Sequence, residues 1–342
     1  MSPARAALRF ARSIRGAAAM AARALVVCLT FDAVSGHGSA ASLPSPGSAA
    51  LSQVDAWPGD DRRCREADVW LVSTRRLPAV CAMPPSADVV VERHELTGDR
   101  GRWVRSDVAS LLADESRPLI VFIHGNRYEM ADAKRQGVLL SRHLGACPSA
   151  GVAPRTVIFS WPSEQRGILL KDGRAKFQRA HADGHYLAWL LARVQPERPL
   201  AIVGYSFGAL ITAEAFADLV AVGRADRPGR THVVLVAPAV RCDALAPTGP
   251  YRPLVESIDR LTLVINSRDD ALRFFPLLDR QVRAEALGYV GMPRRWLPTG
   301  LEYLATDAAS VVGKNHGLPL YLASPALSRR IVDGTVVGLG GE

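Results

Sequence analysis

The sequence predicts an α/β fold: a single domain with a mostly parallel central sheet and helices on both faces. The chain has 342 residues, of which 48% are hydrophobic and 22% are charged, as in ordinary globular proteins. Several short runs are rich in Val, Ile and Leu without alternation, which is typical of strands covered on both faces. Helix-length segments lie between the later runs, and this alternation predicts βαβ units.

The beginning of the chain has the features of an export signal. Residues 1–40 contain five arginines and one aspartate, and an apolar run extends from Gly16 to Phe31 before a stretch of small residues. A basic start, a short apolar core and a small-residue cleavage zone are typical of a secretory signal. We therefore expect residues 1–41 to be a signal peptide and the protein to be periplasmic or secreted. An uncleaved leader that anchors the protein in a membrane is the alternative.

Charge and cysteine spacing argue against several other classes of protein. The formal net charge is +9, but the basic residues beyond the leader are scattered, so no nucleic-acid partner is expected. The four cysteines beyond the leader have no Cys-x-x-Cys spacing, so neither a metal nor another cofactor is expected. In an oxidising compartment Cys64–Cys81 and Cys147–Cys242 are natural pairs, and unpaired thiols are the alternative. The oligomeric state is not encoded in any recognisable pattern.

The strands and helices follow a linker that is rich in proline, glycine and serine, at residues 42–66. The domain is expected over residues 67–335. Seven apolar runs predict its strands, and they are, in chain order, "ADVWLVSTRRL", "ADVVVERHEL", "RPLIVFIHG", "RTVIFSWPS", "RPLAIVGYS", "HVVLVAP" and "RLTLVINSRDD". Between the later runs, "HADGHYLAWLLARV" and "ALITAEAFADLVAVG" predict helices, and Gly223 is a good stop for the second.

A Gly-x-Ser-x-Gly sequence lies where a predicted strand meets a predicted helix. It is "GYSFG", with Ser206 in the centre and Gly204 and Gly208 on either side. Open parallel sheets bind their ligands at the carboxyl ends of strands, and a serine on such a turn has the context of a nucleophile elbow. Side chains at the two glycines would collide with neighbouring elements. Ser206 is therefore the candidate nucleophile.

A serine nucleophile needs a histidine base, which in turn needs a carboxylate to orient it. Two histidines follow Ser206, and His232 is expected at the surface or at a strand edge. His316 lies in a glycine-flanked loop before the last helix, so it is the candidate base. The acid is expected after the strand "RLTLVINSRDD", where Asp269 is favoured and Asp270 is the alternative.

The reaction also needs backbone N–H donors that face the developing oxyanion. One donor is expected to be Phe207, which directly follows the candidate nucleophile. The other is expected in the loop after "LIVFIHG", at Asn126, with Gly125 as the alternative. His124 in the same loop is expected to shape the loop rather than to act as an acid or base.

These motifs together resemble the α/β-hydrolase superfamily and, within it, the bacterial DUF900 group of uncharacterised hydrolases. The resemblance extends over about residues 68–330 and rests on "VWLVSTRR", "LIVFIHGN", "VIFSWPS", "GYSFGA", "VVLVAP", "NSRDDAL" and "NHGLPLYLASPAL" in that order. It implies the α/β-hydrolase fold and a Ser206–Asp269–His316 triad. The family usually has an aromatic residue between Gly and Asn, whereas Asn126 follows Gly125 directly, so the second oxyanion donor stays open.

The expected function is that of an esterase- or lipase-like serine hydrolase, which cleaves an ester, thioester or amide through an acyl-enzyme. Residues 273–314 predict helices, which either cover the site or face the core. A cover would favour an apolar or lipid-like acyl substrate and would make membrane contact possible. The competing hypothesis is a catalytically silent binding or scaffold protein of the cell envelope, because a fold alone does not establish activity.

Overall fold

The computed structural model describes part of the chain, namely residues 68–79, 89–97, 100–145, 153–167, 169–279 and 282–339. The expected signal peptide at 1–41 and linker at 42–66 lie outside these residues, as do Cys64, Cys81 and Cys147. Cys242 has a free thiol among the described residues, and its expected partner Cys147 lies outside them.

In the described part of the chain, nine strands form one sheet with the order β3-β2-β1-β5-β4-β6-β7-β8-β9. They are β1 (Asp68–Ser73), β2 (Val90–Thr97), β3 (Arg100–Ser106), β4 (Leu119–Ile123), β5 (Arg155–Ser160), β6 (Leu200–Tyr205), β7 (Thr231–Val236), β8 (Arg260–Ile265) and β9 (Glu302–Asp307). Across the sheet from β1 through β5, β4, β6, β7 and β8 to β9, neighbouring strands are parallel. At the other edge, β2 pairs antiparallel with both β1 and β3. The predicted α/β architecture is confirmed.

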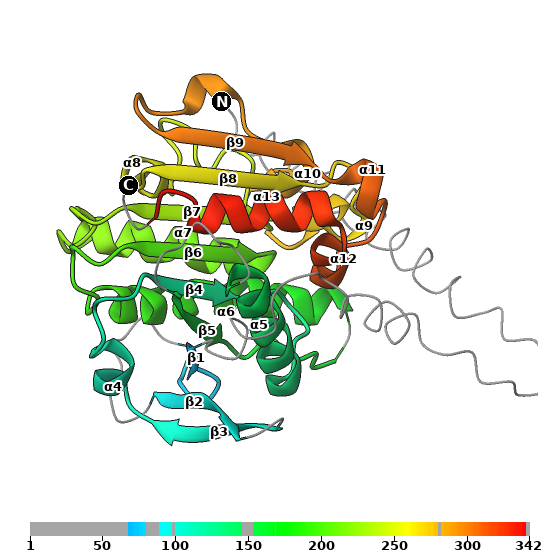
Figure 1. Cartoon of the computed structure of the whole chain (residues 1–342). Helices are drawn as coiled ribbons and strands as arrows, with labels where there is room; N and C mark the ends of the chain where they lie inside the picture. The colour runs from blue at the N-terminus through cyan, green and yellow to red at the C-terminus, as the bar shows by residue number, and fades with distance from the viewer. Residues whose placement is uncertain are drawn as a thin grey trace, which may run out of the picture. The chain divides into compact units, whose positions relative to one another are not determined.

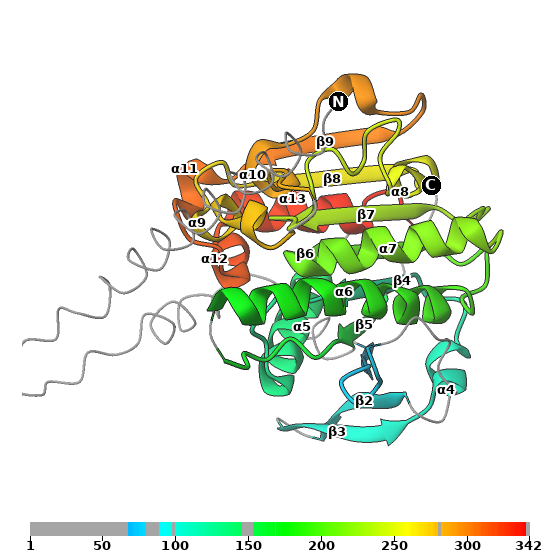
Figure 2. The same ribbon diagram turned by 180° about the vertical axis from the view of Figure 1, so that it is seen from behind.

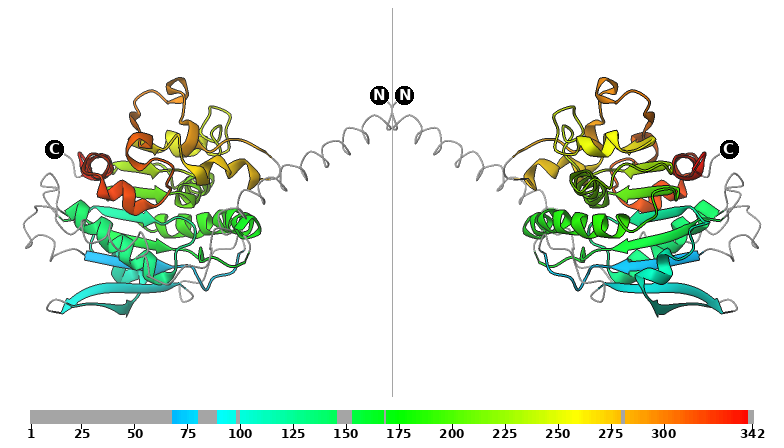
Figure 3. Two further views of the ribbon diagram at one scale, coloured as in Figure 1. Left: turned by 90° about the vertical axis from the view of Figure 1, so that its right-hand side faces the viewer. Right: turned by 90° about the vertical axis from the view of Figure 1, so that its left-hand side faces the viewer.

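Helices cover both faces of this sheet. The helices are α4 (Val108–Leu112), α5 (Met130–Gly145), α6 (Leu169–Leu191), α7 (Phe207–Ala221), α8 (Arg252–Glu256), α9 (Asp270–Arg273), α10 (Leu287–Val290), α11 (Ala309–Val312), α12 (Leu318–Ala323) and α13 (Pro325–Val336), with short 3-10 turns at Phe275–Leu277 and Arg294–Trp296. α5 and α13 lie on the face toward the viewer in Figure 1, and α6 and α7 lie on the opposite face in Figure 2. Figure 3 shows the two layers from the sides.

The strands predicted from unalternating apolar runs are the buried strands in the middle of the sheet. Every residue of β4, β5, β6 and β7 is buried. Burial of apolar surface contributes roughly 25 cal/mol per Å², so strands that are covered on both faces contribute much of the stability of the domain. Because these strands are parallel, their carboxyl ends and the loops that follow them meet at one edge of the sheet.

Two strands were not predicted, and both lie at edges of the sheet. β3 reads "RGRWVRS", and β9 reads "EYLATD" with half of its residues exposed. Such strands are held by backbone pairing with one neighbour, and little apolar surface is buried, so they carry a weak sequence signal. The expectation of helices throughout residues 273–314 is therefore wrong in part, because β9 pairs in parallel with β8 there.

His232 is buried rather than exposed, which corrects the expectation of a surface or strand-edge residue. It lies on β7 with 1% of its surface exposed, and its Nδ1 lies 3.3 Å from the carbonyl oxygen of Thr335 in α13. Burial lowers its pKa to about 4, and the charge of Arg260 acts in the same direction. The hydrogen bond to Thr335 and the charges of Asp259 and Glu302 oppose this shift.

This burial predicts a pH-dependent stability. The unfolded chain protonates His232 below about pH 6.5, whereas the folded protein does so only near pH 4. The contribution of neutral His232 to the free energy of unfolding is therefore complete above about pH 6.5 and is lost as the pH falls toward 4. Relative to His232→Gln, which keeps a donor for Thr335 but cannot titrate, the wild type should lose about 2 kcal/mol more unfolding free energy between pH 7 and 5. Urea unfolding at the two pH values measures this difference. Equal losses in both proteins would contradict it.

No helix within the described residues is both long enough and apolar enough to cross a membrane.

Candidate active site

The loops that carry the candidate residues meet where the strand order reverses. After β4 the chain crosses to β5 on one side, and after β5 it returns to β6 on the other side of β4. Ile123 at the end of β4 pairs with Gly204 in β6, so the loop that starts at His124 lies beside the turn that carries Ser206. The short helices α9 to α12 gather at the same carboxyl ends of the strands (Figure 1). This reversal point is where open α/β sheets place their ligands.

Ser206 lies on a strained turn between β6 and α7. Its φ of 55° and ψ of −119° are rare for a residue other than glycine. The turn is held from both sides, because the N–H of Ser206 donates to Val236 and its carbonyl accepts from Ala209 and Ala239. Strain of this kind persists only where the surroundings impose it, and it directs the serine side chain out of the strand-to-helix corner.

Two glycines make this corner possible because backbone passes very close to Gly208 and side chains pass very close to Gly125. A Cβ on Gly208 would lie 2.2 Å from the carbonyl oxygen of Ile123, so α7 could not approach β4 with any side chain there. A Cβ on Gly125 would lie 2.9 Å from the Cβ of Ser206 and 2.8 Å from the ring of Tyr205. The loop after β4 therefore lies directly against the turn of Ser206.

A chain of hydrogen bonds joins Ser206, His316 and Asp269. The Nε2 of His316 lies 2.8 Å from the hydroxyl of Ser206, and its Nδ1 lies 2.6 Å from Oδ2 of Asp269. Asp269 is fully buried, while the side chain of His316 is 23% exposed and Ser206 is 5% exposed. The three residues are separated by up to 110 positions in sequence, and their order is serine, acid, histidine.

The structure distinguishes between the two candidate acids. Asp269 caps α9, and its Oδ1 accepts from the backbone N–H groups of Ala271 and Leu272 at 2.9 and 3.0 Å. Both oxygens of this carboxylate are therefore engaged, and their positions are set by the helix start. Asp270 is exposed and contributes only a backbone N–H, which donates to the carbonyl of Lys314. The favoured residue Asp269 reaches His316, and the alternative Asp270 does not.

Backbone N–H groups that could stabilise an oxyanion lie beside Ser206. Phe207 is the first residue of the fifteen-residue helix α7, whose N-terminus carries a partial positive charge. In the described part of the chain, no hydrogen bond uses the backbone N–H of Phe207, Asn126 or Gly125. The next two N–H groups of the loop are engaged, since Arg127 donates to the carbonyl of Ser163 at 2.7 Å and Tyr128 donates to its hydroxyl at 3.1 Å.

Residues that the sequence analysis did not assign to the site hold this loop in place. Ser163 ends the "FSWPS" motif; it accepts these two bonds, and its hydroxyl also donates to the carbonyl of Tyr128 at 3.1 Å. Trp161 of the same motif donates its indole N–H to the carbonyl of His124 at 2.8 Å. Arg75 of "VSTRR" donates to the carbonyl of Tyr128 at 2.8 Å and pairs with Glu164. Both motifs can be read in the sequence, but only the fold shows that they meet the loop after β4.

His124 is a buried residue that shapes the loop. It has no exposed surface, its Nδ1 donates to the carbonyl of Gly125 at 2.9 Å, and its ring stacks on Tyr128 and Trp161. Burial lowers its pKa to about 3, so the ring is neutral at ordinary pH. This neutral, enclosed imidazole is not in reach of a substrate.

Comparisons with known proteins agree with this architecture. The model of a family described as "Alpha/beta hydrolase of unknown function (DUF900)" matches residues 102–292, which is more than half of the chain. The chain belongs to this family. The match includes Ser206 and Asp269, whereas Arg75 and His316 lie outside it.

Solved structures similar to this DUF900 hydrolase include two esterases and a putative hydrolase. Esterase Est22 is 14% identical to this chain with a TM-score of 0.40, and the match covers 92% of this chain and 96% of Est22. Esterase B from Lactobacillus rhamnosis is 12% identical with a TM-score of 0.37 over 84% of this chain and 89% of its own. A putative hydrolase from Agrobacterium vitis S4 is 15% identical with a TM-score of 0.36 over 73% and 94% of the two chains. At these values the likeness says nothing about substrate. A search of curated proteins finds no match.

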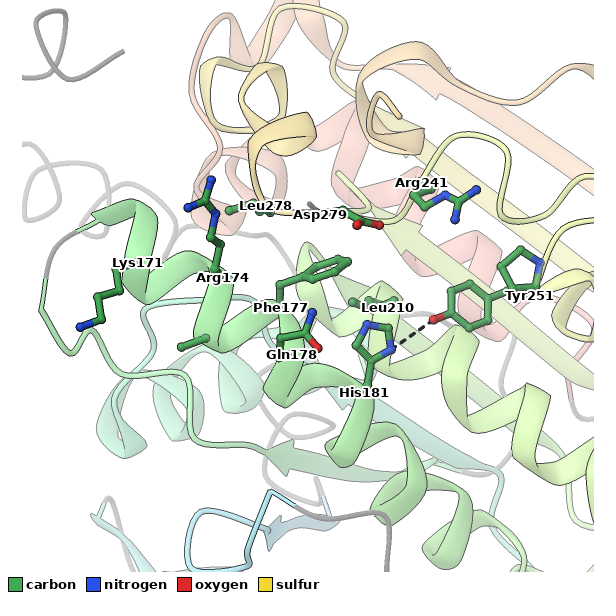
Figure 4. A pocket seen from close by; sticks show the side chains of 12 residues that line it. Lys171, Arg174, Phe177, Gln178, His181, Leu210, Arg241, Tyr251, Leu278 and Asp279 are labelled. Atoms are coloured by element: carbon green, nitrogen blue, oxygen red, sulfur yellow. Dashed lines mark hydrogen bonds between the residues drawn. The ribbon is translucent and has the colours of Figure 1, made fainter. Parts of the chain in front are cut away.

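The DUF900 hydrolase has a cavity of about 870 Å³ on the side of α6 and α7 (Figure 4). Phe177, Leu210 and Leu278 contribute apolar surface, while Lys171, Arg174 and Arg241 contribute cationic groups. Leu210 lies one turn of α7 after Ser206, and the ring of Phe177 packs on that of Phe207 with 6.2 Å between centroids. The cavity therefore adjoins the first turn of the helix that begins at the candidate nucleophile.

A polar cluster closes one end of this cavity. Tyr251 donates to Oε2 of Glu214 at 2.5 Å, and His181 lies 3.1 Å from the same oxygen. Burial alone would raise the pKa of Glu214, but the hydrogen bonds from His181 and Tyr251 outweigh it and hold this pKa below its ordinary value. Glu214 is therefore ionised at neutral pH and joins α6 to α7 and to the loop before α8.

The segment between Asp269 and His316 lies partly at the cavity and partly in the sheet. Phe275 is buried against Phe177, and Leu278 and Asp279 line the cavity, whereas residues 302–307 extend the sheet as β9. Only the beginning of the expected cover at 273–314 therefore lies near the cavity. Within the described residues no cluster of three or more metal-ligating side chains occurs.

Proposed function

We propose that this chain is a serine hydrolase that cleaves carboxylic esters, and related thioesters or amides, through an acyl-enzyme. The observation that carries the proposal is the pair of contacts at 2.8 and 2.6 Å that join Ser206, His316 and Asp269. The strained turn at Ser206 and the N–H groups without acceptors beside it support the same reaction.

In the proposed first step the hydroxyl of Ser206 attacks the ester carbonyl while Nε2 of His316 takes its proton. Asp269 accepts from the Nδ1–H of His316, which keeps Nε2 free to act as a base and stabilises the imidazolium that forms. The carbonyl oxygen becomes an oxyanion that accepts from the N–H of Phe207 and from Asn126, with Gly125 as the alternative donor.

In the second step the tetrahedral intermediate collapses, and the bond to the leaving alcohol breaks. His316 returns the proton to the departing oxygen, which leaves an ester between the acyl group and Ser206. Water then attacks this ester with His316 again as the base, so that the carboxylic acid is released and the serine is restored.

We place part of the substrate in the cavity beside α7, since Leu210 in the first turns of that helix lines it and Phe177, Leu210 and Leu278 give it apolar surface. Apolar surface suits an acyl chain or another hydrocarbon group, and the cationic side chains at the rim suit polar or anionic parts of the same molecule. A panel of esters with acyl chains of increasing length measures how much of the cavity is used.

The experiment that tests the function is labelling of the wild-type protein with a fluorophosphonate, followed by mapping of the labelled peptide. The adduct is expected on the peptide that contains Ser206. The loss of ester hydrolysis is expected to be proportional to the fraction of the protein that is labelled. If the folded protein takes up no probe and hydrolyses no ester, the catalytically silent scaffold becomes the better description.

We also propose that the protein is exported, on the basis of the arginine-rich start and apolar run in residues 1–31. N-terminal sequencing of the secreted or periplasmic protein should begin near residues 40–42. An intact Met1 in a membrane fraction would instead favour the uncleaved anchor.

A further inference from the structure

His316 lies on a short irregular link, so its position has to be imposed by its surroundings. The link joins α11 to α12 across residues 313–317, and it begins at Gly313, whose φ is 63°. None of these residues has a helical or strand hydrogen-bonding pattern of its own. A histidine that must keep two contacts within hydrogen-bond distance cannot depend on such a link alone.

Three consecutive carbonyl groups of this link each accept one hydrogen bond from one of two other segments of the protein. The carbonyl of Lys314 accepts from the backbone N–H of Asp270 at 3.1 Å. The carbonyl of Asn315 accepts from Nδ2 of Asn266 at 3.0 Å. The carbonyl of His316 accepts from the phenol of Tyr205 at 2.5 Å.

The donors belong to the same two segments that contact the ring of His316. Tyr205 directly precedes Ser206, which meets Nε2, and Asn266 and Asp270 flank Asp269, which meets Nδ1. Each segment therefore holds both the backbone and the ring of the histidine. The side-chain oxygen of Asn266 accepts from the N–H of Arg268 at 3.1 Å, so the orientation of its amide is fixed as well.

Tyr205 also touches the loop of the oxyanion donors. Its ring lies against Gly125, where an added Cβ would come within 2.8 Å, and it packs edge-on against Tyr128 with 6.2 Å between centroids. The centroid of the Tyr205 ring also lies 5.3 Å from that of His316. Burial raises the pKa of Tyr205 well above its ordinary value, so the phenol remains a donor throughout the working pH range.

We infer that Tyr205 and Asn266 are positioning residues that hold the histidine loop against the nucleophile turn and the acid. The inference rests on the proposed function. These two side chains set the distance between Nε2 of His316 and the hydroxyl of Ser206. Neither residue contacts the reacting atoms, so their effect passes through the backbone of residues 315 and 316.

Tyr205→Phe tests the inference, because it keeps the ring contacts and removes only the donor to His316. We expect kcat and the rate of fluorophosphonate labelling to fall about 10- to 100-fold, as for a displaced catalytic group, with little change in KM. The far-downfield proton signal of the His316–Asp269 hydrogen bond should broaden or disappear in the variant.

The matched control is Tyr186→Phe. Tyr186 is equally buried, and its phenol also donates to a backbone carbonyl, that of Pro78, at 2.8 Å. This variant should lower the thermal midpoint about as much as Tyr205→Phe does and leave kcat and the downfield signal unchanged. Equal kcat and equal signals in the two variants would overturn the inference.

Asn266→Ala is a second route to the same result should Tyr205→Phe not fold. It should lower kcat in the same direction, and the double variant should lose less than the product of the single losses, because both donors order one loop. Multiplicative losses would indicate independent structural damage. The downfield signal distinguishes failure of the serine hydrolase proposal from failure of the positioning role. If the wild-type protein shows the signal but hydrolyses no ester, the serine hydrolase proposal fails. The effect of Tyr205→Phe on the signal then still decides whether Tyr205 positions His316.

Discussion

Replacing Ser206 with alanine is expected to lower kcat/KM for ester hydrolysis by at least about 10⁴-fold and to abolish fluorophosphonate labelling. The hydroxyl of Ser206 lies on a turn held by three backbone hydrogen bonds, and Nε2 of His316 lies 2.8 Å from it. Alanine removes the attacking oxygen and leaves the turn and the oxyanion donors in place, so substrate binding should be nearly unchanged. Steady-state kinetics and thermal unfolding of the purified variant measure the two effects separately.

Ser328→Ala is a matched control for this substitution. Ser328 is also buried, and its hydroxyl lies 3.0 Å from Nδ1 of His143. It lies in the regular helix α13 rather than on a strained turn, so the same change should leave labelling and hydrolysis intact. Labelling that persists in Ser206→Ala and is lost in Ser328→Ala would show that the nucleophile has been misassigned.

Replacing Asp269 with asparagine is expected to lower kcat/KM by about 10⁴-fold without unfolding the protein. Oδ1 of Asp269 accepts from the N–H groups of Ala271 and Leu272, so the amide oxygen of an asparagine must occupy that place. Its NH₂ group then faces Nδ1 of His316, which has to present a lone pair and carry its proton on Nε2. In this tautomer the histidine donates to Ser206 and cannot take its proton.

Asp270→Asn is the control for Asp269→Asn because it makes the same chemical change one residue away. Asp270 is exposed, and it contacts the histidine loop through a backbone N–H that the substitution retains. Its kcat/KM should stay within about threefold of the wild type, as for an exposed surface charge. A large loss in Asp270→Asn with a small one in Asp269→Asn would reverse the assignment of the acid.

The sequence by itself determined the fold class and the identity of the candidate residues. The middle strands were predictable because both of their faces are buried, which requires unbroken apolar runs such as "LIVFI" in β4. Ser206 was predictable because a tight corner between a strand and a helix requires small residues at Gly204 and Gly208. His316 and the pair Asp269 and Asp270 followed from chain order, since the reaction requires a base and an acid.

The tertiary structure decided what depends on contacts between distant segments. The edge strands β3 and β9 are stabilised by pairing with one neighbour, so their own residues carry little signal. Asp269 and Asp270 are adjacent residues of the same type, so the sequence alone does not separate them. The start of α9 buries Asp269 against His316 and exposes Asp270. The roles of Tyr205 and Asn266 likewise depend on carbonyl groups about 50 to 110 residues away, because a hydrogen bond to backbone leaves no preferred residue type at the accepting position.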